Sequence, residues 1–215
     1  MTAPIVLPLG EAAFTIRLGE VASVANAQKA AALAKAIEHA KLRGVSEIVP
    51  AVASVAVFYE PAGTNQVQRK HALESLVAHS SSLPLLPSSQ VHAIPTRYDG
   101  VDLDDVATRV GLSTDDVVRL HSDREYHVLS LGFLPGWAYL GELDPALALP
   151  RRSTPRTRIP AGAVAIMGSQ TGIYPRVSPG GWNIIGSTSV VLFDANRDAP
   201  ALFAPGDRVR FTPVP

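Results

Sequence analysis

From Tyr126 onward, the chain consists of short β-rich segments separated by glycine and proline turns, and this texture constrains the fold more than any other feature. The segments are Tyr126–Leu131, Ala163–Met167, Trp182–Ile185, Val190–Phe193 and Arg208–Thr212. Many short strands joined by Gly/Pro turns are typical of a compact β-barrel or sandwich. The pattern predicts a β-barrel in the C-terminal part of the chain.

The N-terminal part has a different pattern, in which strands alternate with helices. Ala13–Leu18 and Ile48–Tyr59 are rich in β-branched and aromatic residues and predict strands, with a turn or an edge position at Pro50. The alanine-rich stretch Ala22–Arg43 has apolar residues near helical spacing. Gly44 is placed to end this helix in the left-handed conformation.

A proline- and serine-rich interruption, Ser80–Ser89, separates the two parts and predicts a linker. We expect domains at residues 1–82 and 83–215. The expected fold class is α+β, with a small N-terminal α+β sandwich followed by the barrel. The remaining expected elements are a helix at Asn65–His79, a strand at Val91–Tyr98, and helices at Leu103–Val110 and Ser113–His121, the last capped by Ser113.

The composition limits the function classes. With 19 basic and 19 acidic residues the net charge is zero, which argues against nucleic acid or an anionic membrane as a partner. The chain has no cysteine, so disulfides, a thiol nucleophile and thiolate metal sites are excluded. The first residues lack a basic segment followed by an apolar run, and no apolar stretch is long enough to span a membrane. We expect a cytoplasmic protein.

Two neighbouring segments are candidates for ligand binding. The loop Gly132–Gly141 places three aromatic residues among three glycines and a proline, which suits either a close backbone approach to a ligand or a barrel corner filled by aromatics. Four arginines follow it on a proline-interrupted segment, at Arg151, Arg152, Arg156 and Arg158. Guanidinium groups bind carboxylate or phosphate in a bidentate manner, so these arginines could contact an anionic ligand. Alternatively, they could form surface ion pairs or contact a partner protein.

Polar residues in the following turns are further candidates. Gln170, Thr171 and Tyr174 lie between glycines and prolines, and turn geometry does not require their side chains, so we expect them to contact a ligand. His121 and His127 flank Tyr126; either could act as a base, although a lone histidine is more often structural.

Other chemical motifs are lacking. The sequence has no phosphate loop of the GxxxxGK[ST] kind, no HExxH and no GxSxG motif. Asp102, Asp104 and Asp105 are most simply the solvated first turn of a helix, and we expect no metal site there.

The segments from Leu131 to Gly186 together resemble the allophanate hydrolase subunit 1 family, which includes the B-type subunit of 5-oxoprolinase, Kip-type sporulation-kinase inhibitors and a carboxyltransferase-like domain of urea carboxylases. The motifs that carry the resemblance are Leu131–Gly141, Leu143-Asp144-Pro145, Pro150-Arg151-Arg152, Thr154-Pro155-Arg156, Ile159-Pro160-Ala161-Gly162, Val164-Ala165-Ile166, Gln170–Pro175 and Ser178–Gly186. The resemblance implies a cyclophilin-like barrel and a larger homologous partner, which is subunit 2 of allophanate hydrolase or the C-type subunit of 5-oxoprolinase.

The resemblance implies that the chain is one subunit of a heteromeric, ATP-dependent 5-oxoprolinase. Together with the C-type subunit and a separate A-type subunit, such an enzyme opens 5-oxoproline to glutamate. ATP with Mg²⁺ would bind at or beside the partner. The alternatives are an allophanate hydrolase- or urea carboxylase-associated subunit, and a regulatory inhibitor of a sensor histidine kinase.

Combining the resemblance with the loop chemistry gives an expected site. The expected catalytic residues are His127, Arg156 and Gln170. The expected substrate-binding residues are Phe133, Pro135, Gly136, Arg151, Arg158, Thr171, Tyr174, Gly180, Gly181 and Trp182.

The chain departs from the family pattern at two places. Members usually read GRTP where this chain has Gly186-Ser187-Thr188-Ser189, and they have a longer, glycine-rich loop with a glutamate where this chain has only Tyr98-Asp99-Gly100-Val101.

Overall fold

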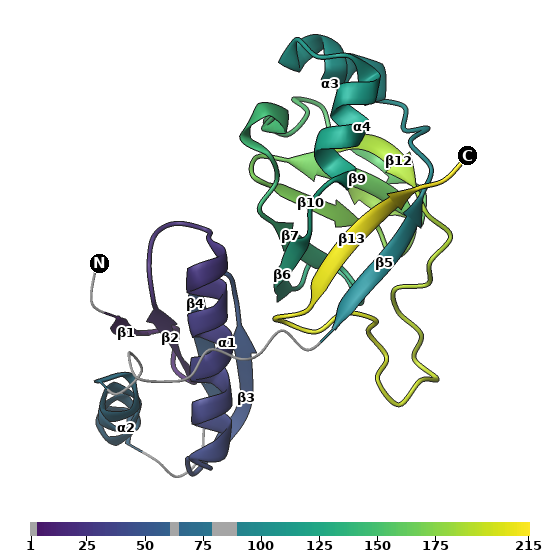
Figure 1. Cartoon of the computed structure of the whole chain (residues 1–215). Coiled ribbons are helices and arrows are strands. Elements are labelled where there is room, and N and C mark those ends of the chain that lie inside the picture. Colours follow the sequence, from purple (N-terminus) through teal and green to yellow (C-terminus); the bar gives the residue numbers. More distant parts are fainter. Residues whose placement is uncertain (1–3, 61–64, 79–89) are drawn as a thin grey trace. The chain divides into compact units, whose positions relative to one another are not determined.

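The computed structural model describes residues 4–60, 65–78 and 90–215 (Figure 1). The chain divides into two units, Met1–Pro87 and Ser88–Pro215. The predicted linker Ser80–Ser89 and the predicted boundary between residues 82 and 83 lie outside the described residues. The expected mixture of helices and sheets, with a C-terminal barrel, is confirmed.

The first unit packs two helices on an antiparallel sheet. Its strands are β1 (Ile5–Pro8), β2 (Ala13–Arg17), β3 (Val45–Pro50) and β4 (Ser54–Tyr59), and its helices are α1 (Val24–His39) and α2 (Gln66–Ala78). The strand order is β1-β2-β4-β3. Alternate strand residues such as Phe14, Ile16 and Val57 point to one face, where they join Leu33 of α1 and Leu73 of α2 in a buried core.

Gly44 does not end helix α1 as predicted. The helix ends at His39, and Lys41 (φ 45°) is the first residue after it with a left-handed backbone. Gly44 is also left-handed (φ 78°), but it lies in the turn that leads into β3. Leu42 packs against the core of this unit, so the chain continues beyond the end of the helix before it turns.

The second unit is built on a sheet that curls into a barrel. Its strands are β5 (Val91–Thr96), β6 (Tyr126–Leu131), β7 (Ala138–Gly141), β8 (Arg156–Ile159), β9 (Ala163–Met167), β10 (Gln170–Ile173), β11 (Ser178–Gly180), β12 (Asn183–Ser187) and β13 (Arg208–Pro213). Its helices are α3 (Leu103–Val110), α4 (Thr114–Ser122) and the 3₁₀ turn η2 (Pro145–Leu147). Within residues 90–215 the main sheet has the order β12-β9-β10-β7-β6-β13-β5, and β8 pairs with β11 separately.

A short bridge joins the two edges of the main sheet. Arg97, just after β5, donates its amide to the Ser187 carbonyl at 2.9 Å, and the Ser187 amide donates to the Arg97 carbonyl at 2.7 Å. The two edge strands are thereby brought together, and the seven strands form a nearly closed barrel. Closure satisfies backbone groups that an open edge would leave to solvent.

Strand β9 separates the inside of the barrel from its outer face. Val164 and Ile166 point into the main core, whereas Ala163 and Ala165 point outward to a second, smaller cluster. Helices α3 and α4 lie against β12 and β13 (Figure 1). Ser113 caps α4 as predicted, because its side chain accepts the Asp116 amide at 3.1 Å.

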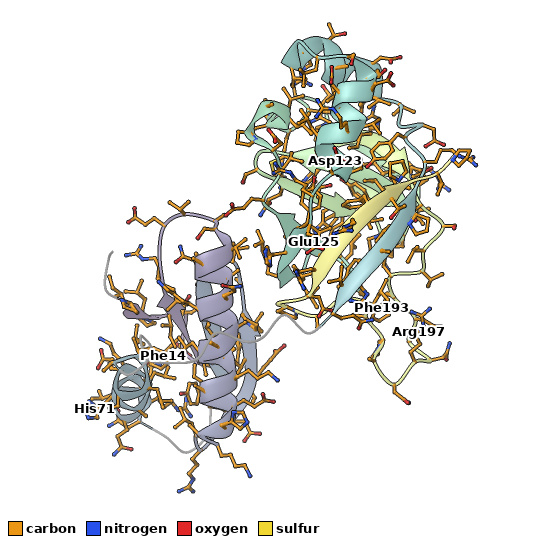
Figure 2. All side chains as sticks on the ribbon, in the orientation of Figure 1. Phe14, His71, Asp123, Glu125, Phe193 and Arg197 are labelled. Carbon is orange, nitrogen blue, oxygen red and sulfur yellow. The ribbon has the colours of Figure 1, made fainter. Side chains whose placement is uncertain are left out.

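The predicted strand Val190–Phe193 is not formed. This segment belongs to the loop between β12 and β13, on which the labelled Phe193 and Arg197 lie (Figure 2). Phe193 makes an isolated bridge to Ala201 within the same loop. The adjacent edge of β12 is already occupied by the bridge to Arg97, so the β-rich segment pairs locally instead of extending the barrel.

Candidate functional site

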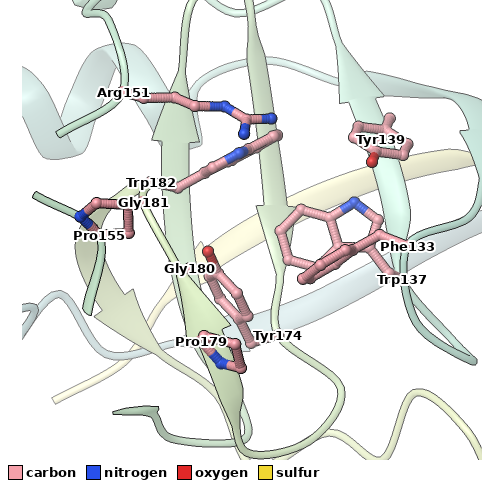
Figure 3. Close-up of a pocket in the computed structure, with 10 residues that line it drawn as sticks. All are labelled: Phe133, Trp137, Tyr139, Arg151, Pro155, Tyr174, Pro179, Gly180, Gly181 and Trp182. Carbon is pink, nitrogen blue, oxygen red and sulfur yellow. The ribbon is translucent and has the colours of Figure 1, made fainter. Parts of the chain in front are cut away.

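An aromatic cavity of about 250 Å³ lies in the second unit, where the outer cluster of the barrel meets β8 and β11 (Figure 3). Its lining residues come from β7 and the loop before it, from the segment before β8, and from β11 and the turns around it. They are Phe133, Trp137, Tyr139, Arg151, Pro155, Tyr174, Pro179, Gly180, Gly181 and Trp182. A concave, largely apolar site with a few polar groups is the usual form of a small-molecule site.

Small residues on the outer face of the barrel make room for this aromatic layer. Ala165 of β9 and Gly172 of β10 are paired on that face, and a Cβ atom at Gly172 would lie 2.9 Å from the Trp137 ring. Trp137 is 1% exposed and meets Trp182 edge to face, with ring centroids 5.0 Å apart. Its Nε1 atom is buried and has no hydrogen-bond partner among the described residues. The tryptophan is therefore packed by shape, with one donor unused.

The loop before β7 brings Phe133 to the rim of the cavity. Phe133 has a left-handed backbone (φ 62°) and remains 57% exposed, although its ring contacts Trp137 edge to face at 5.5 Å. The left-handed Gly136 (φ 84°) lies directly against Phe193, where a Cβ atom would come within 2.7 Å. The neighbouring Pro135 and Gly136 shape this loop, and neither lines the cavity.

Tyr174 and Gly180 are in direct contact in the cavity wall. A Cβ atom at Gly180 would collide with the Tyr174 hydroxyl and would also press on Ile159. Burial raises the pKa of Tyr174, although the Trp182 amide, which donates to its hydroxyl, and the charges of Arg151 and Arg156 oppose that rise. The phenol is therefore neutral near pH 7, and its hydroxyl proton can be donated to an acceptor.

A buried carboxylate organises the arginine-rich segment. Asp102 precedes α3 and is 2% exposed; it accepts hydrogen bonds from Arg152 Nη1 at 2.8 Å and from both Nη atoms of Arg156 at 2.8 and 2.7 Å. The Ile184 amide donates to the same carboxylate at 2.8 Å. We call these four residues the Asp102 clamp. The expectation that Asp102 belongs to a solvated turn is wrong, because its carboxylate faces inward onto two guanidinium groups; Asp104 is exposed as expected.

Arg151 differs from the two clamped arginines. It is exposed, lines the cavity and has no ion-pair partner among the described residues. Its guanidinium group lies near Trp182 in the cavity view (Figure 3). A cation at the wall of an aromatic cavity is suited to bind a small carboxylate or phosphate.

The structure brings together six of the thirteen residues expected in the site. Phe133, Arg151, Tyr174, Gly180, Gly181 and Trp182 line the cavity. Four lining residues were not expected: Trp137, Tyr139, Pro155 and Pro179. A sequence signal for them does exist. Ala163, Ala165 and Gly172 are small residues on the outer face of the barrel, and they leave room for bulky aromatic side chains.

The other expected residues lie elsewhere in the same unit. Arg156 is next to the cavity but bonded to Asp102. His127 and Gln170 both pair with Gly141, on neighbouring strands, and therefore occupy one row across β6, β7 and β10. Arg158 is an exposed residue of β8 outside the lining set.

Thr171 lies in a buried hydrogen-bond network. Its hydroxyl donates to the Ala165 carbonyl at 3.1 Å and is 2.9 Å from His121 Nε2. The other ring nitrogen of His121 is 2.7 Å from the Tyr98 hydroxyl. Thr171 is fully buried and does not reach the cavity.

The two departures from the family pattern meet in space. Ser187 donates its hydroxyl to Asp99 Oδ1 at 2.8 Å, next to the bridge that closes the barrel. The turn after β12 and the short loop after β5 are thus one structural feature, in which a change in either affects the other.

The part of the chain that the structure describes contains neither a metal-binding cluster nor a membrane-spanning helix. Across residues 4–60, 65–78 and 90–215, no group of three or more His, Asp or Glu side chains is arranged to hold a metal ion. None of the helices in those ranges is both long and apolar enough to cross a membrane.

Comparison with known proteins identifies the family. The family model of the carboxyltransferase domain, subdomain C and D, matches residues 4–203. The B-type subunit of 5-oxoprolinase from Escherichia coli O157:H7 is 40% identical over 208 residues, which cover 95% of this chain and 94% of that protein.

Solved structures agree on the fold. The crystal structure of TTHA0988 is similar with a TM-score of 0.82 and 43% identity, over 94% of this chain and 40% of that longer chain. The urea carboxylase of Kluyveromyces lactis has a TM-score of 0.77 at 23% identity, over 99% of this chain and 22% of that one. The chain thus spans less than half of each of these two proteins, and it belongs to the family of the carboxyltransferase domain, subdomain C and D.

Proposed function

We propose that this chain is one subunit of a heteromeric, ATP-dependent amidohydrolase of the 5-oxoprolinase type, and that the aromatic cavity is its half of the substrate site. The observation that carries the proposal is Arg151, a cation without an ion-pair partner among the described residues, in the wall of an otherwise aromatic cavity. The name of the Escherichia coli relative supports the same reaction.

The cavity has the chemistry that a small cyclic amide acid requires. Aromatic faces such as those of Trp137 and Trp182 cover the apolar ring, and Arg151 binds the carboxylate by charge-assisted hydrogen bonds. The neutral Tyr174 hydroxyl can donate to the lactam carbonyl oxygen. Binding at both polar ends would orient the ring and expose one face to a second chain.

In the proposed reaction, the lactam carbonyl oxygen attacks the γ-phosphorus of ATP and ADP leaves. Phosphorylation weakens the amide resonance, so that water can add to the carbon. The C–N bond then breaks and leaves a γ-glutamyl phosphate, which a second water hydrolyses to glutamate and phosphate. Cations near the cavity stabilise the charge that develops on the oxygens. Arg156, His127 and Gln170 remain the proposed catalytic residues; of these, Arg156 directly follows Pro155 of the cavity wall.

We propose that the nucleotide and its Mg²⁺ bind where this chain meets a larger homologous subunit, the C-type, in the cytoplasm, and that a separate A-type subunit joins the complex. The greater length of TTHA0988, of which this chain matches 40%, is consistent with a second segment completing the same assembly. We also propose that the barrel is of the cyclophilin-like type.

The test is co-purification with the larger subunit, followed by measurement of ATP turnover with 5-oxoproline and with urea. Turnover that depends on 5-oxoproline supports the proposal. Turnover that depends on urea would favour the carboxylase alternative. A complex without either activity, together with inhibition of a sensor histidine kinase by the chain, would favour the regulatory alternative.

A further inference from the structure

We infer that Asp102 is a positioning residue for ligand binding, which fixes Arg151 in the cavity wall by holding the neighbouring Arg152 and, further along the same segment, Arg156. The inference rests on the proposed function, because it concerns how the same cavity recognises an anionic ligand. Asp102 does not line the cavity itself, so any effect on binding must pass through the residues it holds.

The Asp102 clamp holds the arginine-rich segment at two points, each of which is next to a cavity-lining residue. Arg152 is adjacent to Arg151, and Arg156 is adjacent to Pro155. Among the described residues, neither Arg152 nor Arg156 has another acidic partner. Because the side chains of Arg152 and Arg156 are both held, the three residues between them and the adjacent Arg151 have little freedom to turn.

The same carboxylate also ties this segment to the opposite wall. Asp102 accepts the Ile184 amide, two residues after Trp182, at 2.8 Å. A backbone bond from the Arg152 amide to the Gly181 carbonyl, also 2.8 Å, joins the two walls directly. The backbone bond sets their spacing, whereas Asp102 sets the direction in which the arginine side chains leave the segment.

Local charge distinguishes a positioning role from a simple electrostatic one. One carboxylate faces two guanidinium groups, and Arg151 adds a third positive charge nearby. Burial alone would raise the pKa of Asp102, but the hydrogen bonds from Arg156 and the Ile184 amide, with the charges of both arginines, hold it below its usual range. Removing this negative charge would by itself strengthen the binding of an anion. Weaker binding would therefore report lost geometry.

The chain provides its own reporter for the test, because both of its tryptophans, Trp137 and Trp182, line the cavity. Tryptophan fluorescence of the full-length chain would be titrated with 5-oxoproline and with 2-pyrrolidinone, the same lactam without the carboxylate. The KM for 5-oxoproline in the co-purified complex is the second readout. We expect Asp102→Asn to weaken 5-oxoproline binding about tenfold and to leave 2-pyrrolidinone binding unchanged.

A double-mutant cycle tests whether Asp102 acts through Arg151. In an Arg151→Ala background, Asp102→Asn should have little further effect on the affinity for 5-oxoproline. Asp104→Asn is the matched control, because it removes an exposed carboxylate two residues away. Arg152→Lys is a milder second variant, which keeps the charge but loses the planar fork; we expect it to weaken 5-oxoproline binding roughly threefold.

Each outcome decides between the two proposals. A wild-type chain and complex that respond to neither lactam contradict the proposed function. A second outcome is that the wild type binds 5-oxoproline and that Asp102→Asn and Arg152→Lys bind it equally well or more tightly. If both variants keep the wild-type circular dichroism spectrum, this outcome overturns the role of Asp102 but not the proposed function. The role of Asp102 is also overturned if Asp102→Asn lowers the affinity for 5-oxoproline equally in the wild-type and the Arg151→Ala backgrounds.

Discussion

Thr171 Oγ1 lies 2.9 Å from His121 Nε2 in the fully buried part of the barrel. The Thr171 hydroxyl proton is directed to the Ala165 carbonyl, so Oγ1 accepts and Nε2 carries the imidazole proton. Nδ1 is then the acceptor for the Tyr98 hydroxyl at 2.7 Å. All three contacts are satisfied by a neutral histidine, whereas a second proton on Nδ1 would force the Tyr98 hydroxyl to turn its own proton away from the ring.

Acid should weaken the barrel through this histidine. Burial, with a smaller contribution from Arg124, lowers the pKa of His121 from 6.5 to about 3. Below pH 6.5 the unfolded chain takes up a proton that the folded chain does not, so the free energy of unfolding falls as the pH drops towards 3; above 6.5 there is no contribution from this group. The slope approaches about 1.4 kcal/mol per pH unit.

Urea unfolding followed by tryptophan emission, which reports the barrel because both tryptophans lie there, measures this slope between pH 7 and 4.5. His121→Gln should remove most of it relative to the wild type. His71→Gln, at an exposed position of α2, should retain it. An unchanged slope in His121→Gln would show that other groups cause the acid sensitivity.

Under the proposed function, Arg151→Ala should raise the KM for 5-oxoproline in the co-purified complex by roughly 10- to 100-fold. This corresponds to the loss of about 1.5–3 kcal/mol of charge-assisted hydrogen bonding. Arg176→Ala removes an exposed arginine outside the cavity lining and serves as the control. Equal KM values for the two variants would show that Arg151 does not bind the substrate.

Gly180→Ala should abolish ligand binding more readily than it unfolds the protein. The added Cβ collides with the Tyr174 hydroxyl and with Ile159, so the wall must move, at a cost of about 1–3 kcal/mol in the free energy of unfolding. Gly132→Ala is the control, because an added Cβ there meets only Tyr139, at an ordinary 3.8 Å. Fluorescence titration of the two variants compares them; similar affinities would contradict the close packing at Gly180.

Gly186→Ala should loosen the barrel seam. Its Cβ would lie 2.5 Å from the Arg97 carbonyl oxygen, at the bridge between the two edge strands. We expect the free energy of unfolding to fall by about 2–4 kcal/mol. Ser187→Ala, which removes only the bond to Asp99, should cost about 1 kcal/mol or less. Thermal unfolding of both variants tests this order.

Local patterns predicted the regular elements well where one face is buried. The expected bounds of α3, β6 and β9 agree with the structure, because their apolar residues recur with the period of a helix or strand. The strands β7, β8, β10 and β11 were not expected. They are three or four residues long and rich in glycine, proline or arginine, so their pairing depends on distant partners.

The candidate site could be predicted only in part for the same reason. The glycine, proline and aromatic signals identified Phe133, Tyr174 and Trp182, which do line the cavity. The burial of Asp102 could not be read from its neighbours Asp104 and Asp105, because the arginines that pair with it lie 50 and 54 residues further along the chain. Long-range ion pairs leave no local pattern in a sequence.

The position of β13 between β5 and β6 has a consequence for biosynthesis (Figure 1). A ribosome delivers β5 and β6 first, yet the strand that joins them, parallel to one and antiparallel to the other, arrives last of the three. Until residues 208–213 emerge, Ile94 and Val128 lack their neighbours Val209 and Phe211 in the core. Such a nascent chain exposes apolar surface of the kind that chaperones protect, so completion of the barrel must follow translation of its final strand.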